Sequence, residues 1–158
     1  MAFRPSTLPA RFAALSRYPG GRALFSWLVG RLVPYSGSIG ARVEALAPGS
    51  AVLSLRDRRA VRNHLGSVHA IALVNLAELT SGLAMLTAAG DDVRGIVTGL
   101  EIRYLKKARG PLMATSTVAP PRVTQAMPTQ VTATIHDASG EAVAEATVHW
   151  LLAPVPGR

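Results

Sequence analysis

Two kinds of hydrophobic periodicity alternate along the chain. Apolar positions recur with a period of two within residues 40–46, 51–55, 96–104, 112–118, 131–135 and 142–150. A period of two is typical of β-strands with one buried face. The Pro-Gly pair at 48–49 predicts a hairpin between the first two strands. Short turns at 109–111 and 137–140 predict antiparallel neighbours further on, so we expect a six-stranded antiparallel meander with one apolar face.

Two of these strands indicate which face is buried. In the strand at 96–104, the side chains expected on one face are Ile96, Thr98, Leu100, Ile102 and Tyr104. In the last strand, the corresponding side chains are Ala142, Ala144, Ala146, Val148 and Trp150. A sheet with such a face needs an apolar partner to cover it.

Helical periodicity occurs in two places. Residues 7–33 carry a broken apolar stripe around 19–21, which predicts one or two amphipathic helices covering a sheet edge or forming a lid over a ligand. Residues 68–88 predict the only long helix after that opening, with Ser67 as N-cap and Gly90 as C-terminal stop. Because this helix is apolar nearly all the way round, we expect the sheet to wrap around it.

The same long helix has the length of a membrane span. Asn75, Glu78 and Thr80 lie in its middle, however. An unpaired carboxylate is strongly unfavourable near a bilayer centre, so a buried helix of a soluble fold is the better interpretation. No transmembrane segment is expected.

Composition favours one globular domain. The chain has 158 residues, of which 49% are hydrophobic and 16% charged, and it contains no cysteine. Disulfides, thiolate metal ligands and cysteine nucleophiles are therefore excluded. The first 21 residues lack the uninterrupted apolar core of a signal peptide, so a cytoplasmic location is expected. The four histidines are scattered, with no carboxylate at ligand spacing, so no metal site is expected.

The net charge of +8 raises the question of a polyanionic partner. Basic residues gather in two small clusters: Arg56, Arg58, Arg59 and Arg62, and then Lys106, Lys107 and Arg109. Neither cluster has the interleaved aromatic residues on which single-stranded nucleic acids stack, so no nucleic-acid partner is expected. Small clusters suit a compact polyanion such as a phosphorylated cofactor, or they are solvated loop charges.

A lone acid in the apolar helix is the strongest sign of a functional site. Burying an ionised carboxylate without a partner costs on the order of several kcal/mol. Glu78 must therefore face water, a ligand or another subunit, and we expect a cleft shared by two copies of the chain. Asn75, Ser81 and Gly82 share its helix face at spacings of three and four residues and are candidates for contacting a substrate.

A polar, glycine-containing loop at 63–69 leads into the N-terminus of this helix. The unpaired backbone N–H groups around His69, Ala70 and Ile71 are suited to hold a developing oxyanion or a thioester carbonyl. Together with Gly66 in the preceding turn, these residues are the candidates for positioning a substrate.

The loop and the helix together resemble a known signature. The run Asn63, Gly66, His69 and Glu78, followed by Gly82, is similar to that of hotdog-fold thioesterases of the phenylacetate-degradation type. In that family an asparagine precedes an acidic residue by fifteen positions, the spacing of Asn63 and Glu78 here. An uncharacterised hotdog subfamily is more similar still, through the pairs at 63–64 and 69–70 and the Leu-Ala-Glu at 76–78.

The resemblance covers about residues 35–152 and departs from the family at Ala70 and Ile71, where the family has two glycines. It implies an α+β hotdog fold over residues 35–158, with an antiparallel six-stranded sheet wrapped around a long central helix and a helical extension at 1–34. It also implies a homodimer, or a dimer of dimers, that hydrolyses an acyl-CoA or related acyl thioester at the subunit interface. Coenzyme A would be part of the substrate, and no other cofactor is expected.

The resemblance assigns roles to individual residues. Glu78 would act as general base on water or directly as nucleophile, and Asn63 of the other subunit would orient the water or the carbonyl. The residues that would meet the phosphates of coenzyme A are Lys106, Lys107, Arg109, Arg58 and Arg59.

Other functions stay open at this point. A hotdog dehydratase or hydratase would use His64 with Glu78. A non-catalytic module that binds acyl thioesters or fatty acids is favoured by the missing glycines, and a membrane-surface protein would use the basic opening helix. The residues also have structural interpretations: Asn63 as a turn residue, Glu78 as the partner of an arginine, and His69 as a packing residue.

Overall fold

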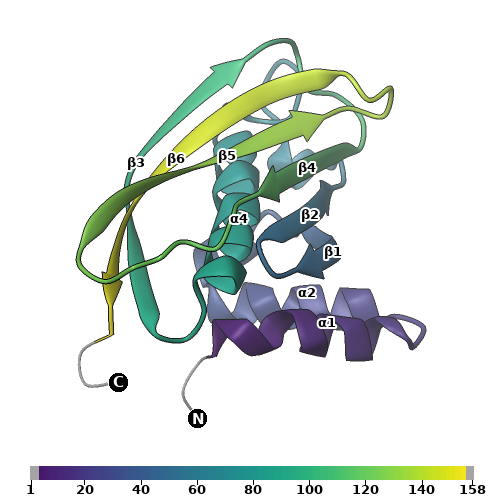
Figure 1. Cartoon of the computed structure of the whole chain (residues 1–158). Coiled ribbons are helices and arrows are strands. Elements are labelled where there is room, and N and C mark those ends of the chain that lie inside the picture. Colours follow the sequence, from purple (N-terminus) through teal and green to yellow (C-terminus); the bar gives the residue numbers. More distant parts are fainter. Residues whose placement is uncertain (1–3, 156–158) are drawn as a thin grey trace.

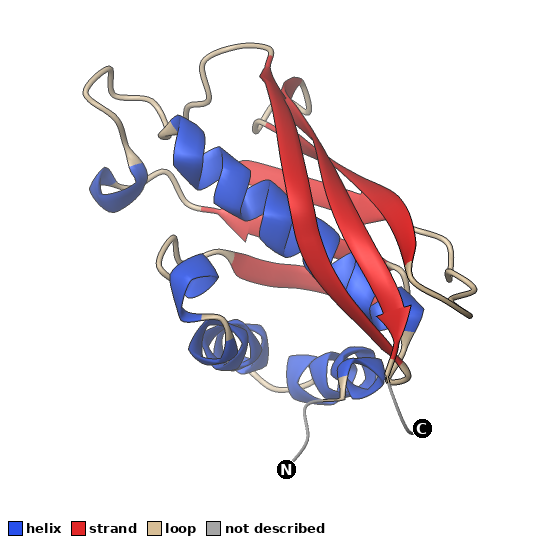
Figure 2. Cartoon of the chain, turned by 90° about the vertical axis from the view of Figure 1, so that its left-hand side faces the viewer, coloured by secondary structure: helices blue, strands red, loops and turns tan. Residues whose placement is uncertain are grey.

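One long helix lies in the concave side of a curved sheet, and two shorter helices close one end (Figures 1 and 2). The structure is a computed structural model, and it describes residues 4–155. Its helices are η1 (Pro5–Thr7), α1 (Leu8–Ser16), α2 (Gly21–Leu32), α3 (Pro34–Gly37), η2 (Arg59–Val61) and α4 (Ala70–Ala89). Its strands are β1 (Arg42–Ala47), β2 (Ser50–Leu55), β3 (Val93–Tyr104), β4 (Leu112–Thr117), β5 (Met127–His136) and β6 (Ala142–Pro154). The six expected strands and the long helix are confirmed.

The sheet is fully antiparallel, but the expected meander is wrong. The strand order is β1-β2-β4-β5-β6-β3, so β2 pairs with β4, and β3 pairs with β6 at the far edge. The reason is α4, because a helix of 20 residues is about 30 Å long and carries the chain across the sheet before β3 begins. Figure 1 shows β3 separated from β2 by β6, β5 and β4.

The predicted single face of β3 is also wrong. Ile96 pairs with Leu151, whereas Leu100 pairs with the buried Val148. The register shifts between Val97 and Gly99, and such a bulge adds one residue and moves the following side chains to the other face. Ile96 is therefore 63% exposed, on the opposite face from Leu100.

The core lies between α4 and the concave face of the sheet. Leu76, Ala77 and Met85 of α4 have no exposed surface, and the predicted inner face of β6 is buried from Ala144 to Trp150. Helix α4 is long and apolar enough to cross a membrane, with a mean hydropathy of 1.5, but 67% of that stretch is buried inside this fold. This packing is what the apolar surface of the helix requires.

The C-terminal end of α4 was predicted correctly from sequence, but its N-cap was not. Gly90 ends the helix with φ +80°, as expected. The N-cap is His69 and not Ser67, because the His69 Nδ1 accepts the backbone N–H of Ile71 at 3.1 Å. Ser67 instead donates its backbone N–H to the Asn63 Oδ1, at 3.1 Å, and belongs to the preceding turn.

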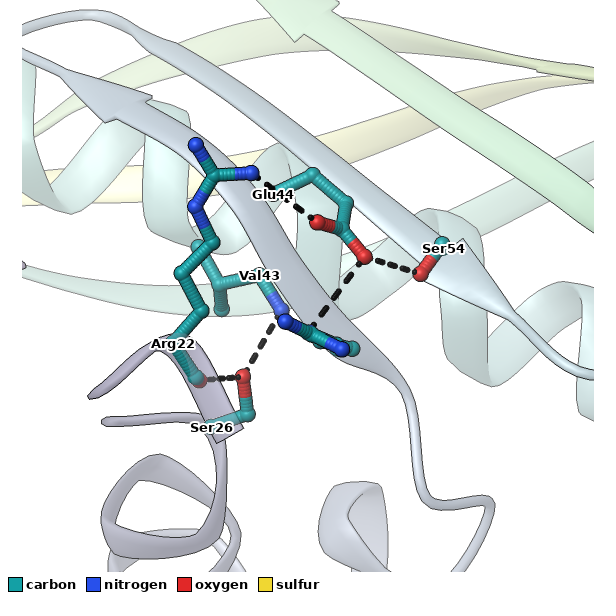
Figure 3. Close-up of polar contacts among 6 residues, drawn as sticks. Arg22, Ser26, Val43, Glu44 and Ser54 are labelled. Carbon is teal, nitrogen blue, oxygen red and sulfur yellow. Dashed lines mark hydrogen bonds and ion pairs between the residues drawn. The ribbon is translucent and has the colours of Figure 1, made fainter. Parts of the chain in front are cut away.

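The N-terminal helices pack into the core and are hydrogen-bonded to the first strand. Phe12 of α1 and Phe25 of α2 meet edge to face, with ring centroids 5.2 Å apart, and both belong to the main core. The Ser26 Oγ accepts the backbone N–H of Val43, at 2.9 Å, and donates to the carbonyl of Arg22 (Figure 3). Helix α2 therefore covers the outer edge of β1, as expected of helices that protect a sheet edge.

Candidate functional site

The polar face of α4 meets the short helix α3 of the same chain. Asn75 donates its Nδ2 to the carbonyl of Tyr35 at 3.3 Å, and the Ser36 hydroxyl donates toward the Glu78 carboxylate. Residues 34–37 therefore supply some of the hydrogen-bond partners that the polar face of α4 requires. A ligand or a second subunit would supply the others. Asn75 is buried, and its Oδ1 accepts no hydrogen bond from residues 4–155.

Glu78 opens into an apolar pocket of about 130 Å³. The pocket is lined by Leu8, Val29, Leu32, Val33, Ser36, Glu78, Leu79, Gly82, Leu83, Leu86 and Trp150. Helices α1 and α2 form one wall, while α4 and β6 form the other. Because Glu78 is the one charged group among these lining residues, the pocket suits an apolar group that presents a reactive polar atom to the carboxylate.

Burial raises the pKa of the Glu78 carboxyl above its ordinary value, and the Ser36 hydroxyl lowers it by a smaller amount. Desolvation disfavours the charged form, while a hydroxyl that donates to the carboxylate favours it. A carboxyl with a raised pKa is a stronger base once it is ionised, which suits proton abstraction near neutral pH.

Gly82 leaves room in this pocket. A Cβ at this position would lie 3.7 Å from the Trp150 ring and 4.0 Å from the Glu78 Oε1, both ordinary contact distances. Alanine is preferred over glycine within a helix by about 1 kcal/mol, so we expect Gly82→Ala to raise the free energy of unfolding by up to about that amount. Chemical denaturation measures this change, and a loss of stability would show that the pocket is narrower than described.

Asn63 is a turn residue, and its oxygen is occupied. The Asn63 Oδ1 accepts the backbone N–H groups of Leu65 at 2.9 Å and Ser67 at 3.1 Å. Gly66, at φ +67°, lies at the tip of this turn and donates its N–H to the carbonyl of Asn63. Asn63 can therefore offer a ligand its Nδ2 donors but not its oxygen.

Two of the three expected oxyanion donors are occupied. The backbone N–H of His69 donates to the carbonyl of Val61 at 2.8 Å, and that of Ile71 donates to the His69 ring. The backbone N–H of Ala70 has no acceptor among residues 4–155. Since the His69 Nδ1 accepts a hydrogen bond, a neutral ring carries its proton on Nε2, which is available as a further donor.

Asn63 and Glu78 do not meet within one chain. Asn63 lies before the N-terminus of α4, and Glu78 is nine residues beyond the N-cap His69. At a rise of about 1.5 Å per residue, His69 and Glu78 are therefore roughly 13 Å apart along the helix axis, and Asn63 lies before His69. One water molecule or one carbonyl cannot contact both side chains of the same chain.

Of the other candidates on α4, Ser81 does not face a ligand. It has no exposed surface, and its Oγ donates to the carbonyl of Glu78 within the helix, at 3.0 Å. Asn75, His69 and Ile71 line a second pocket of about 300 Å³ beside the loop at 63–69. His64 is exposed on that loop.

The two basic clusters come together, but their charges are partly used. The Asp57 carboxylate accepts the Arg62 Nε at 2.6 Å and the backbone N–H of Gly110 at 2.8 Å, which joins the loop before α4 to the loop after β3. Lys106 forms ion pairs with Asp137, at 2.7 Å, and with Glu141. Arg58, Arg59, Lys107 and Arg109 take part in no ion pair within residues 4–155. No three His, Asp or Glu side chains in this part of the chain gather closely enough to hold a metal ion.

Comparison with known proteins identifies the family. The family model described as "Domain of unknown function (DUF4442)" matches residues 21–152, which is most of the chain. The chain belongs to the DUF4442 family. The DUF4442 match includes α2 and ends within β6. A search of the curated proteins found no match.

Solved structures place this DUF4442 domain in a superfamily. A structural-genomics protein, APC5556, is 27% identical, with a TM-score of 0.79 over 94% of this chain and 99% of its own. A protein of unknown function from Pseudomonas aeruginosa, named a probable thioesterase, is 26% identical, with a TM-score of 0.73 over 81% and 92%. A thioesterase family protein from Silicibacter pomeroyi shares the fold at 21% identity, with a TM-score of 0.69 over 82% and 96%. The expected hotdog fold of the thioesterase superfamily is confirmed.

Of the residues that line the Glu78 pocket of this DUF4442 domain, only Glu78 and Gly82 were predicted as site residues from sequence. Ser36, Val29 and Trp150 line the pocket from α3, α2 and β6, and of these Ser36 donates toward the carboxylate. Trp150 was expected on the inner face of its strand, but nothing in the pattern placed it opposite Gly82. Ser36 carries no local signal, because its position follows from how α3 crosses α4.

Proposed function

We propose that this protein hydrolyses acyl thioesters, with Glu78 as the general base and an acyl-CoA or related thioester as substrate. The observation that carries the proposal is a half-buried carboxyl with a raised pKa at the wall of an apolar pocket. Its relatives named as thioesterases support the same chemistry. The acyl group would occupy the pocket and present its carbonyl carbon to a water molecule held by Glu78.

The chemistry balances with the groups that the chain supplies. Glu78 takes a proton from water as the oxygen attacks the thioester carbonyl, and the carbonyl oxygen becomes an oxyanion. Collapse of this intermediate breaks the C–S bond, releases the thiol after proton return from Glu78, and leaves the carboxylic acid. The oxyanion would be stabilised by the backbone N–H of Ala70 and the Nδ2 of Asn63 of a second copy of the chain, both of which are free of acceptors within residues 4–155. Direct attack by the carboxylate is the alternative route.

A second copy of the chain would complete this site. Strand β3 is an edge strand of 12 residues, and its apolar Ile96, Val97 and Tyr104 are 63%, 39% and 47% exposed. Leu105, directly after the strand, is 43% exposed. A long apolar edge of this kind promotes pairing with another strand. We propose that β3 pairs with β3 of a second copy and brings Asn63 of one protomer toward Glu78 of the other.

The direct test is release of free coenzyme A from acyl-CoAs of different chain length, followed with a thiol reagent. The small pocket of about 130 Å³ favours short acyl groups, so we expect the rate to be highest for these and to fall for long chains. If no acyl-CoA or acyl-pantetheine releases its thiol above the spontaneous rate, the proposal fails.

Ser36 provides a prediction about pH dependence. Its hydroxyl lowers the pKa of Glu78, so Ser36→Ala should raise that pKa further. A general base must be ionised, and the ascending limb of the plot of kcat/KM against pH should therefore move to higher pH in the variant. The plateau at high pH should change little. If the Ser36→Ala profile coincides with the parent profile, the ionisation that controls the rate is not that of Glu78.

One observation favours a second candidate function, a non-catalytic module that binds acyl thioesters. The backbone N–H groups of His69 and Ile71 already have acceptors, which leaves that of Ala70 as the one free donor of the three expected at the helix N-terminus. Such a module should melt at a higher temperature when acyl-CoA is added and should release no thiol. Thermal shift and thiol release measured on the same sample distinguish the two functions.

A further inference from the structure

A groove of about 920 Å³ runs between α2 and β1, on the outer side of the Glu78 pocket. Four arginines line it: Arg31 from α2, Arg42 from β1, and Arg56 and Arg58 after the end of β2. Glu44 is the one acidic residue among the described residues that line this groove. Arg56 and Arg58 belong to the first basic cluster of the sequence, whereas Arg31 and Arg42 lie outside both clusters.

Two of these arginines are held by groups that leave their charge in place. The guanidinium carbon of Arg31 lies 5.6 Å from the centre of the Trp27 ring. Arg58 donates its Nη2 to the carbonyl of Ile39, at 2.9 Å. A Cβ at Gly40, which has φ +66°, would lie 2.9 Å from this Nη2, so the glycine permits the close approach. An aromatic ring and a carbonyl orient a cation without neutralising it.

The single carboxylate, that of Glu44, does not neutralise the positive charge of the arginines in the groove. Glu44 accepts the Ser54 hydroxyl, at 2.7 Å, and lies 3.5 Å from the Arg22 Nη1 and 3.6 Å from the Arg42 Nε (Figure 3). The Arg42 Nε is buried and makes no hydrogen bond within residues 4–155. Arg31, Arg56 and Arg58 have no ion-pair partner in the same part of the chain. Oriented and uncompensated arginines are the usual means of binding phosphate.

The groove is continuous with the apolar pocket. Val29, Ser36 and Leu79 line both spaces, and the Ser36 hydroxyl donates toward Glu78 at this junction. A ligand that enters from the groove therefore meets the arginines first, then the carboxylate, and last the apolar wall. This order of surfaces matches a molecule with an anionic end, a reactive centre and an apolar end.

We infer that the α2–β1 groove binds the phosphate-bearing arm of the substrate, the phosphopantetheine of coenzyme A or of a carrier protein. Arg31, Arg42, Arg56 and Arg58 contact its phosphates. The location of the thioester at Ser36 and Glu78 rests on the proposed function, whereas the phosphate site rests on the arginines alone. Lys106, Lys107 and Arg109, which line neither the groove nor the apolar pocket, are not needed for it.

Calorimetric titration tests the phosphate site without any turnover. The ligands are coenzyme A, 4′-phosphopantetheine and pantetheine, which lacks phosphate. We expect both phosphorylated ligands to bind at least about tenfold more tightly than pantetheine, with an affinity that falls as salt is added. Tighter binding of coenzyme A than of phosphopantetheine would indicate the free cofactor as source, and equal binding would indicate a carrier protein. Either order supports the site.

The decisive variant is Arg31→Gln/Arg56→Gln, because both side chains are exposed and anchor no backbone. It should weaken coenzyme A binding by about tenfold or more and leave pantetheine binding unchanged. The matched control is Arg11→Gln/Arg122→Gln, which removes the same charge from exposed positions outside the groove. The control should bind coenzyme A within about twofold of the parent.

The proposed phosphate site and the proposed thioester hydrolysis can be disproved independently of each other. Unchanged coenzyme A binding in Arg31→Gln/Arg56→Gln, or equal weakening in the control, overturns the phosphate site even if the protein hydrolyses acyl-CoA. Arginine-dependent binding without release of thiol supports the phosphate site and overturns the hydrolysis.

Discussion

Glu78→Gln should lower kcat on the best acyl thioester by about 10²–10⁴-fold, the range expected when a general base is removed. The glutamine has the same shape and can still accept the Ser36 hydroxyl, but it cannot take a proton from water. The measurement is thiol release under substrate saturation. Glu145→Gln is the matched control, since Glu145 lies on β6 with a half-exposed side chain away from the pocket, and its rate should match the parent.

The melting temperature of Glu78→Gln shows whether the variant has lost only its general base or also its stability. The pKa of Glu78 is raised in the folded state, so the stability that its protonated form contributes is present below the ordinary value of 4.5 and is lost as pH rises through the folded pKa. The glutamine side chain of the variant does not ionise. At pH 7 the Glu78→Gln variant should therefore melt at the same temperature as the parent or higher, and at pH 4 the two should coincide. An inactive variant that melts lower at pH 7 would point to a structural role.

Charged residues on the β3 edge should abolish the proposed dimer. In an Ile96→Lys/Val97→Lys variant, four added positive charges would lie along a symmetric strand pair, which costs on the order of several kcal/mol. We expect the dissociation constant of the dimer to rise by about 100-fold or more, since each factor of ten corresponds to about 1.4 kcal/mol. Sedimentation analysis should show a monomer, and thiol release should fall in parallel, because the proposed site needs both copies.

Met113→Lys is the control for this variant. Met113 is 39% exposed, like Val97, but it lies on β4 inside the sheet and not at its edge. The control should remain a dimer with parental activity. A monomeric parent, or an Ile96→Lys/Val97→Lys variant that stays dimeric and active, would show that β3 is not the subunit contact.

The elements were predictable because each depends on local patterning. The alternation in residues 142–150 and the apolar run of α4 follow directly from the side chains, and Gly90 ends the helix where a positive φ is needed. The strand order was not predictable in this way. Pairing of β2 with β4 depends on the path of α4 across the sheet, and the bulge at Val97–Gly99 reverses the face of Ile96 without any signal in the alternation.

The candidate site was predictable only in part. Burial of Glu78 follows from its apolar neighbours, and the turn formed by Asn63 follows from the asparagine side chain. The N-cap could not be chosen from sequence, because both Ser67 and His69 can accept a backbone N–H and the loop geometry decides between them. Ser36 reaches Glu78 across 42 positions of sequence, and the arginine groove depends on the packing of α2 against β1.

The most direct test of the central claim is subunit complementation. Asn63→Asp keeps the acceptor oxygen for Leu65 and Ser67 but removes the Nδ2 donors, and Glu78→Gln removes the base. Each variant alone should be nearly inactive. When equal amounts are dissociated and reassociated, half of the dimers should be mixed, and each mixed dimer should hold one intact site.

The account predicts that this mixture recovers about a quarter of the parental rate of thiol release, since one site in four is then intact. A mixture no more active than its two components, although mixed dimers are present by mass, would contradict a site built from Asn63 of one protomer and Glu78 of the other.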